Sequence, residues 1–422
     1  MTPATIAKID RLAGRPLCAL LTLLDWPRRL LAPARKTDPK KILFVKLVEM
    51  GSTVLACPAF EEAERKIGRD NLYILVFKPN RAIVDMLPFF RPENVITVDD
   101  TSLTAFIPSL LRALRRIRAA KIDTAIDMEG LTRASAIITR LTGARTRVGY
   151  RNFTAEGPYR GRLFTHELNY NFQHHVSRMF WALTRAAQAD PREIPLLKET
   201  PPIPLPPLPV FQPEPEDLRD TARLIRQQGG HPALFPSVVL LNPNCSDLLP
   251  LRRWPTERFI ELGQRLLAER DDVCVIVTGA PDETEGARAI AASIGKPPRV
   301  LSLAGHTTLR QLLTLYGLSR LLISNDSGPC HFASLAPVRV IALFGPETPL
   351  LYGPLGPGKR CVSAGLACSP CVNILNHRFS PCLDNRCMQA ISVDEVHDLA
   401  LELLDESPPG PAPAAVPAQD IS

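Results

Sequence analysis

The residues best suited to chemistry lie in one short segment of the C-terminal half. After the apolar residues 321–324 come Asn325, Asp326, Ser327 and Gly328, and a short helix is expected over residues 330–335. Free backbone N–H groups at a helix start, with a hydroxyl and a flexible glycine, are suited to holding phosphate. Asp326 could bind a sugar hydroxyl, and His331 is a titratable donor. We therefore expect a nucleotide diphosphate-sugar to bind here.

Two further groups of polar residues are expected beside the same ligand. Asn244 and Ser246 follow the apolar residues 238–242 and could donate hydrogen bonds to phosphate, although a simple loop would explain them nearly as well. Asp282 and Glu283 follow a Gly-Ala-Pro turn. They could bind a ribose hydroxyl, or they could be ordinary acidic residues at the start of a helix.

Arg252 and Arg253 precede a helix start expected at Pro255. A guanidinium at this point would neutralise the charge that grows on a departing diphosphate, in place of a divalent metal. The alternative is a solvated basic turn. We expect no cofactor and no catalytic metal.

Short apolar segments alternate with helical patterns in both halves of the chain. The first half has expected strands at 41–47, 72–77, 95–98, 122–127 and 147–150, and helices at 52–67, 103–119 and 133–141. The second half has strands at 238–242, 273–278, 300–303, 321–324 and 340–344, and helices at 256–269, 283–294, 309–316 and 393–404. Such alternation is typical of βαβ units with a parallel sheet covered on both faces.

We predict an α/β protein with two doubly wound, Rossmann-like domains that face a central cleft. The expected parts are a basic, apolar arm at 1–40, a first domain at 41–200, a proline-rich linker at 201–215, a second domain at 216–390, a C-terminal helix at 391–406 and a disordered tail at 407–422. Proline lacks the N–H donor and fixes φ, so the linker should be stiff and extended. Ligands of such sheets bind at the carboxyl ends of the strands.

The formal charge of +7 is concentrated at the N-terminus. Residues 1–41 hold nine Lys or Arg and three Asp, a net of +6, so nucleic acid is not an expected partner of the rest. The apolar residues 17–24, which Asp25-Trp26-Pro27 is expected to end, are too few to span a bilayer. The arm could attach to an anionic membrane surface, pack on the body as an ordinary helix, or be a cleaved signal peptide. The first interpretation favours a cytoplasmic protein at the inner membrane face.

Ten cysteines in 422 residues favour reduced thiols in a cytoplasmic protein. Cys368, Cys371, Cys382 and Cys387 lie around His377 at spacings compatible with a structural zinc or another thiolate-bound centre. Disulfides and free thiols remain alternatives for these four residues.

Several motifs together resemble glycosyltransferase family 9, which includes lipopolysaccharide heptosyltransferases and has the two-domain GT-B architecture. They are NDSGPCHFA at 325–333, VIALFGPETP at 340–349, LRRWPTERF at 251–259, VTGAPDE at 277–283 and DMEGL at 127–131. The resemblance covers residues 41–400. It implies inverting, metal-independent transfer from ADP-heptose or a related donor to a lipid-linked or lipopolysaccharide-core acceptor. The family commonly has Lys at the position of Arg252, so the charge is kept.

The acceptor side departs from the family pattern at Ser52. Active heptosyltransferases typically have Gly-Asp after the first strand, and that Asp is the expected general base. A serine cannot take a proton unaided near neutral pH. Glu49 on the same loop could be the base, and so could Asp127 or Glu129 at the end of a facing strand; loss of activity and a leaving group that needs no base are the other options. In their bland roles Glu49 is a solvated carboxylate and Asp127 a helix cap.

These observations favour a glycosyltransferase that takes part in surface-glycan assembly. A noncatalytic nucleotide-sugar binder is the alternative from another class, because Ser52 replaces the expected base. A sugar nucleotide epimerase of the same architecture is a weaker alternative, since it would need a second acid or base across the cleft.

Overall fold

The computed structural model describes residues 10, 12–31, 34–130, 132–151, 158–230, 236–245, 249–374, 376 and 379–407. They form two compact units, one up to Pro207 together with Ile374 and Asn376, and one made of the rest from Leu208 onwards. The division falls within the proline-rich residues 201–215. Residues 408–422 of the predicted tail lie outside the described part of the chain.

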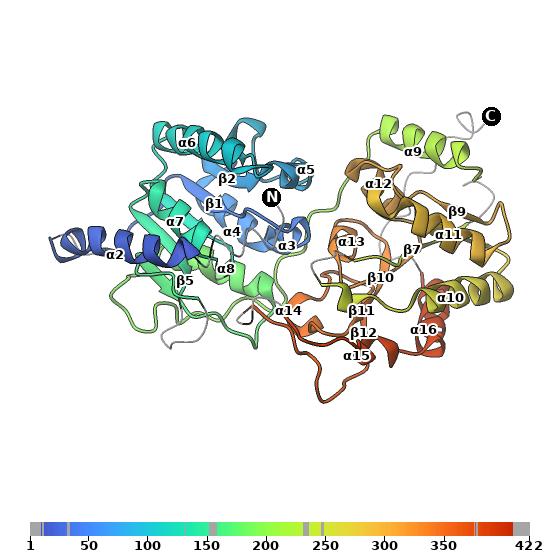
Figure 1. Ribbon diagram of the computed structural model, residues 1–422. Helices are drawn as coiled ribbons and strands as arrows, with labels where there is room; N and C mark the ends of the chain where they lie inside the picture. The colour runs from blue at the N-terminus through green and yellow to red at the C-terminus, as the bar shows by residue number, and fades with distance from the viewer. Residues whose placement is uncertain are drawn as a thin grey trace. The chain divides into compact units, whose positions relative to one another are not determined.

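The first unit contains a six-stranded parallel sheet in the order β3-β2-β1-β4-β5-β6 (Figure 1). Its strands are β1 (Ile42–Val45), β2 (Leu72–Phe77), β3 (Val95–Val98), β4 (Thr124–Asp127), β5 (Thr146–Tyr150) and β6 (His166–Leu168). Its helices are α2 (Gly14–Leu31), α3 (Met50–Leu55), α4 (Cys57–Ile67), α5 (Arg81–Val84), α6 (Leu103–Ala119), α7 (Arg133–Leu141) and α8 (Val176–Ala186). Strands β1 and β4 are buried along their whole length, as expected for the centre of a parallel sheet.

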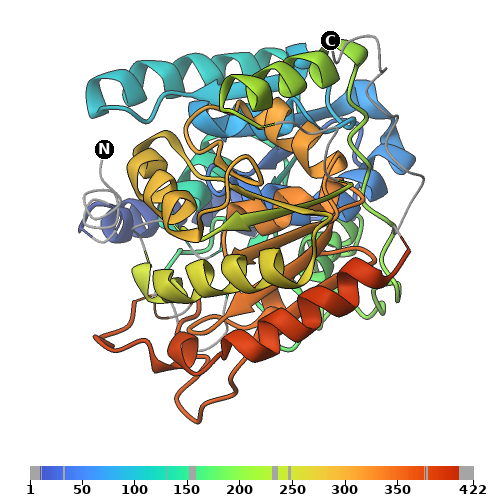
Figure 2. The ribbon, with the colours of Figure 1, turned by 90° about the vertical axis from the view of Figure 1, so that its right-hand side faces the viewer.

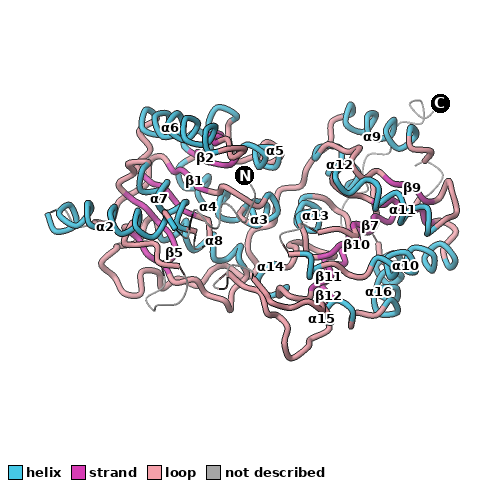
Figure 3. Tube along the Cα trace, viewed as in Figure 1, coloured by secondary structure: helices cyan, strands magenta, loops and turns pink. Residues whose placement is uncertain are grey.

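The second unit contains another six-stranded parallel sheet, in the order β12-β11-β10-β7-β8-β9. Its strands are β7 (Ser237–Asn242), β8 (Val273–Val277), β9 (Val300–Ser302), β10 (Leu321–Asn325), β11 (Arg339–Phe344) and β12 (Lys359–Ser363). Its helices are α9 (Pro215–Gln227), α10 (Thr256–Glu269), α11 (Thr284–Ile294), α12 (Leu309–Gly317), α13 (Gly328–Phe332), α14 (Pro349–Tyr352), α15 (Arg386–Gln389) and α16 (Val393–Asp405). Figure 3 shows the alternation of helix and strand in both units.

Both sheets are doubly wound, which confirms the predicted fold class. In each unit the chain builds one half of the sheet outward from the centre and then returns to build the other half. The order therefore reverses between β1 and β4, where Val45 pairs with Asp127, and between β7 and β10, where Asn242 pairs with Ser324. Ligands of open α/β sheets bind outside the carboxyl ends of the strands at such switch points.

The C-terminal helix belongs to the core of the second unit. Leu262 and Leu266 of α10 and Ala400 and Leu403 of α16 share one buried apolar cluster, and the two helices pack side by side (Figure 2, α16 in red). The indole Nε1 of Trp254 donates to the carbonyl of Ile391 at 3.0 Å, just before α16. This packing covers one face of the sheet and fixes the segment that carries Arg252 and Arg253.

Several boundaries differ from the prediction because proline has two opposite effects. The helix expected at 52–67 divides into α3 and α4, with Pro58 in the first turn of α4. Pro215 begins α9, where its missing N–H costs nothing. The prediction that the apolar run ends at residues 25–27 was wrong, since α2 continues through Pro27 to Leu31.

Candidate functional site

The carboxyl ends of β7 and β10 are tied together by Asn325. This side chain is fully buried; its Oδ1 accepts from the amide of Trp254 at 3.0 Å, and its Nδ2 donates to the carbonyl of Pro243 at 2.7 Å. Asn385 holds the same segment from the other side, donating to the carbonyls of Leu251 and Arg253. The backbone around the two arginines is therefore fixed at the switch point of the second sheet.

Asp326, Ser327 and Gly328 form the turn that joins β10 to α13. Ser327 is the N-cap of α13 with extended backbone, and its hydroxyl lies 3.2 Å from the hydroxyl of Ser324. The helix has five residues, and a 3₁₀ turn follows it, so its dipole is smaller than the sequence prediction assumed. The backbone N–H groups of the turn, more than a helix dipole, are what this element offers to an anion.

Arg252 reaches the same turn. Its Nη1 lies 3.5 Å from Oδ2 of Asp326, and the arginine side chain is 17% exposed. The Nε of Arg252 has no hydrogen-bond partner among the described residues. Arg253 differs, because its Nη2 donates to the carbonyl of Cys245 at 3.1 Å. Arg252 is thus the arginine of the pair that can donate to a ligand.

Asp326, Cys330 and His331 are buried beside one another, and their polar atoms lie within 4.8 Å of each other. Three such groups could in principle hold a metal ion. However, burial raises the pKa of the Cys330 thiol far above its ordinary value, and the thiol donates to the carbonyl of Ser327 at 3.0 Å. Since a thiol that keeps its proton is a poor metal ligand, these residues fit hydrogen bonding to a ligand better than metal coordination.

Asn244 and Glu283 meet at the ends of β7 and β8, around Gly279. A Cβ at Gly279 would lie 3.0 Å from Oε2 of Glu283 and 3.2 Å from Nδ2 of Asn244, so only glycine leaves these groups in place. Glu283 Oε2 accepts from the amide of Ala280 at 2.7 Å, which is a helix-capping contact, and burial raises the pKa of Glu283. Asp282 is exposed.

Ser246 lies outside the described residues, so its predicted contact with phosphate cannot be compared with the fold. The remaining predicted donor-binding residues come to the carboxyl edge of β7, β8 and β10 from separate parts of the sequence.

At the switch point of the first sheet, Glu129 organises the loop that follows β1. Its Oε1 lies 3.2 Å from Nζ of Lys46 and accepts from the amide of Val48 at 3.0 Å. Lys46 also donates to the carbonyl of Val48. Both charged side chains are almost fully buried. Glu129 therefore fixes the backbone just before Glu49, and sequence reasoning missed Lys46, whose position in an otherwise apolar segment was the available signal.

Glu49 stands at the N-cap of α3 with φ of 66°, in the left-handed region that non-glycine residues rarely adopt. The hydroxyl of Ser52 donates to Oε2 of Glu49 at 3.2 Å and to its carbonyl at 3.0 Å. The serine that replaces the expected aspartate thus contacts the carboxylate three residues before it.

Asp127 is fully buried and already paired. Its Oδ2 contacts the guanidinium of Arg160 and accepts from Ser135 at 2.9 Å, and its Oδ1 accepts from the amide of Glu129 at 2.9 Å. Burial raises the pKa of Asp127 to about 6, although Arg160 opposes the rise. These contacts fit a structural role. No pattern in the sequence pairs Arg160 with Asp127.

The four predicted thiolate ligands lie between β12 and the end of α15. Cys368 and Cys382 are exposed, Cys371 is half-buried and Cys387 is buried. Burial raises the pKa of Cys387, and the other three thiols nearby add to the rise. The thiol of Cys382 donates to the carbonyl of Asp384 at 3.0 Å. A structural thiolate site stays a prediction, and His377 lies outside the described residues.

Known proteins resemble this chain in sequence. The sequence model of glycosyltransferase family 9 (heptosyltransferase) matches residues 110–378. Lipopolysaccharide heptosyltransferase 2 of Salmonella typhimurium is 30% identical over 115 residues, which is 27% of this chain and 32% of that protein. The chain thus spans about a third of the length of this curated relative.

Solved structures share the fold. A glycosyltransferase family 9 protein from Veillonella parvula aligns with a TM-score of 0.66 and 20% identity, covering 89% of this chain and 99% of the other. E. coli ADP-heptose lipopolysaccharide heptosyltransferase II aligns with a TM-score of 0.65 and 18% identity, covering 86% of this chain and 98% of the other. The two doubly wound units are those of the GT-B fold. With a family match over residues 110–378, more than half of its length, this chain belongs to glycosyltransferase family 9.

Proposed function

We propose that this protein transfers a sugar, a heptose from ADP-heptose or a related nucleotide diphosphate-sugar, to a lipopolysaccharide-core or other surface-glycan acceptor. The similar Salmonella protein is a lipopolysaccharide heptosyltransferase, and the similar E. coli structure is an ADP-heptose heptosyltransferase. The observation that carries the proposal is the switch point of the second sheet, where Arg252 and the turn at Asp326–Gly328 lie together. A guanidinium and free amides are suited to a diphosphate.

In the proposed reaction, Glu49 takes the proton of the acceptor hydroxyl, and the oxygen attacks the anomeric carbon from the side opposite the diphosphate. The bond from that carbon to the diphosphate oxygen breaks, its electron pair leaves with the nucleotide, and the anomeric configuration inverts. Arg252 and the amides of Ser327 and Gly328 stabilise the charge on the departing group without a metal. His331 would lie along the diphosphate.

The other donor contacts follow from the positions of the remaining residues. We propose that Asn244 and Ser246 donate to phosphate and that Asp326, Asp282 or Glu283 binds hydroxyls of the ribose or the sugar. Glu283 caps a helix as well, so its loss should also affect folding.

Glu49 is a better candidate for the base than Asp127 or Glu129. Both oxygens of Asp127 are engaged inside the fold, and Glu129 is paired with Lys46 and the amide of Val48. A noncatalytic binder is not favoured, because Glu49 supplies a carboxylate on the loop where Ser52 cannot act alone.

Nucleotide release tests the function. The purified chain would be incubated with a panel of nucleotide-sugars, with and without membrane extract as the source of acceptor. ADP-heptose with extract should give the fastest release. Release from every nucleotide-sugar at the protein-free rate would contradict the proposal.

We also propose that the enzyme works at the inner face of the cytoplasmic membrane, where a lipid-linked acceptor would be held. Within the described residues, none of the helices is both long and apolar enough to pass through a bilayer.

A further inference from the structure

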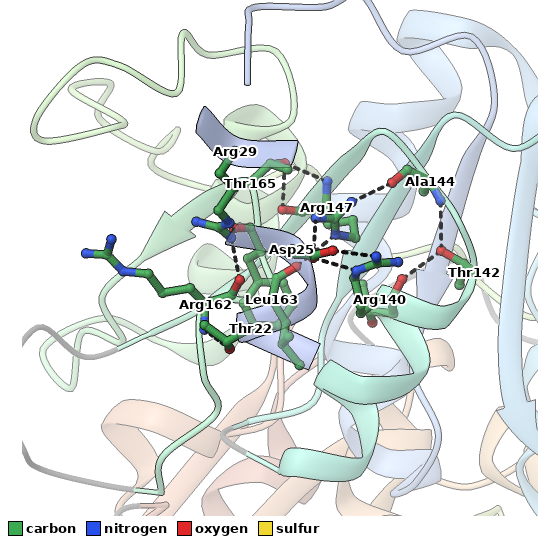
Figure 4. Close-up of polar contacts among 12 residues, drawn as sticks. Thr22, Asp25, Arg29, Arg140, Thr142, Ala144, Arg147, Arg162, Leu163 and Thr165 are labelled. Carbon is green, nitrogen blue, oxygen red and sulfur yellow. Dashed lines mark hydrogen bonds and ion pairs between the residues drawn. The ribbon is translucent and has the colours of Figure 1, made fainter. Parts of the chain in front are cut away.

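Helix α2 is held on the first unit by its polar side. Figure 4 shows Thr22, Asp25 and Arg29 turned toward the body of this unit. The hydroxyl of Thr22 accepts from the amide of Arg162 at 2.9 Å, and Arg29 donates to the carbonyls of Arg162 and Phe164. These contacts fix the orientation of the helix about its axis.

Both acidic side chains at the N-terminal end of the described chain are used in the same way. Asp25 is buried and paired with Arg140 and Arg147 (Figure 4). Asp10, four residues before α2 begins, accepts from the amide of Arg133 at 3.0 Å and contacts its guanidinium at 2.9 Å, at the start of α7. Neither carboxylate faces solvent freely.

The opposite side of α2 is apolar and uncovered. Leu17, Leu20, Leu23, Leu24, Trp26 and Leu30 are between 44% and 66% exposed. We call these six residues the leucine face. An ordinary surface helix turns such residues toward the core and its charges outward, and α2 does the reverse. An exposed apolar patch of this size marks an interaction surface.

The charges around the leucine face indicate what covers it. Arg15 is the one charged residue among the exposed α2 side chains that the structure describes, and Arg35 and Lys36 beyond the helix are exposed too. Residues 1–41 have a net charge of +6. Two copies docked through this face would bring two such basic segments together, whereas an anionic lipid surface would attract them.

We propose that α2 lies flat on an anionic bilayer, with the leucine face among the lipid headgroups and acyl chains and the basic residues on the phosphates. Trp and Leu opposite a polar side, with flanking cations, are typical of helices that bind in the plane of a membrane. The proposal rests on the proposed function only in that a lipid-linked acceptor gives the membrane its purpose. It adds the surface that makes the contact and the lipid chemistry that this surface selects.

Sedimentation with vesicles tests this surface with the full-length protein. Vesicles of phosphatidylcholine alone would be compared with vesicles that also contain phosphatidylglycerol. The wild type should bind the anionic vesicles, and high salt should weaken binding. The double variant Leu20→Gln/Leu24→Gln should bind at least about tenfold more weakly, because it removes two leucines from the bilayer contact.

The matched control is Leu103→Gln/Leu111→Gln, which alters two exposed leucines of α6 in the same unit. It should bind like the wild type, and thermal unfolding followed by circular dichroism should be alike for all three proteins. Equal vesicle binding by the α2 variant and the wild type would overturn the proposal, and so would a wild type that does not bind anionic vesicles. A lipid-free dimer that the α2 variant abolishes would assign the face to a second copy instead.

Vesicle binding does not depend on turnover. A negative result here leaves the transferase proposal standing, and an inactive protein that still binds vesicles leaves this one standing.

Discussion

The guanidinium of Arg252 lies 3.5 Å from the carboxylate of Asp326, although the two residues come from separate βα loops of the second unit. The carboxylate orients the guanidinium at the edge of the turn that begins α13. A diphosphate bound at the turn would find the arginine already aimed, so little conformational freedom remains to be lost on binding.

Replacing Arg252 tests its proposed role in charge stabilisation. Arg252→Met should lower kcat for nucleotide release by about 10²–10³, the usual effect of losing one group that stabilises charge in the transition state. Arg252→Lys should keep part of the activity, because the charge remains. The control is Arg288→Met, an exposed arginine on α11, which should behave like the wild type. Full activity of Arg252→Met would remove this residue from the mechanism.

Glu49→Gln should suppress turnover while leaving affinity for the donor intact. General-base catalysis contributes about 10²–10⁴ in rate, and the amide keeps nearly the same shape. Turnover is measured as nucleotide release and affinity by calorimetry with the nucleotide. Glu93→Gln, an exposed carboxylate in the same unit, is the matched control.

A rescue experiment separates loss of the base from local damage. Adding Ser52→Asp to Glu49→Gln places a carboxylate where the family has one, and it should restore part of the activity. If Glu49→Gln alone were fully active, Glu49 would not be the base.

The buried pair of Lys46 and Glu129 should be needed for stability. Glu129→Gln leaves the ammonium of Lys46 buried without its counter-ion, which should lower the free energy of unfolding by about 3–5 kcal/mol. Urea unfolding measures the loss. The exposed pair of Lys198 and Glu193, altered by Glu193→Gln, should cost less than about 1 kcal/mol. Similar losses in the two variants would argue against a buried ion pair.

The pairing of Asp127 with Arg160 predicts a pH dependence of stability. Burial raises the pKa of Asp127 to about 6, whereas an unfolded aspartate titrates near about 4. The folded protein therefore holds this proton more tightly, and the stability that Asp127 contributes is complete below about pH 4 and is lost as the pH rises through about 6.

Arg160→Met should sharpen this dependence. Its cost should be about 3–5 kcal/mol at pH 7.5, where the carboxylate loses its counter-ion, and less at pH 5, where Asp127 can be protonated. Arg151→Met removes the partner of Glu167 in a more exposed pair and serves as control. A cost for Arg160→Met that is the same at both pH values would contradict the assignment.

Much of the fold followed from local patterns in the sequence. The run Leu72–Phe77 and the stretch Leu103–Ala119 appear as β2 and α6 with the predicted bounds. In α6 the hydroxyl of Ser102 accepts from the amide of Ala105 at 3.1 Å, so the start signal was in the sequence. The alternation of such segments was sufficient to predict two doubly wound sheets.

The remaining features depend on contacts between distant residues. Helix α2 passes through Pro27 because Asp25 and Arg29 are held by the body of the first unit. Arg160 reaches Asp127 from a loop that no pattern singled out. The donor site was easier to predict because its residues follow strands at a switch point, and their positions follow from topology alone.

Calorimetry with ADP tests most directly whether the second unit binds a nucleotide diphosphate with arginine and backbone amides instead of a metal ion. The wild type should bind ADP with the same affinity in the presence of EDTA and of added magnesium, and Arg252→Met should bind it at least about tenfold more weakly. Absence of ADP binding, or binding that requires magnesium, would contradict the proposal.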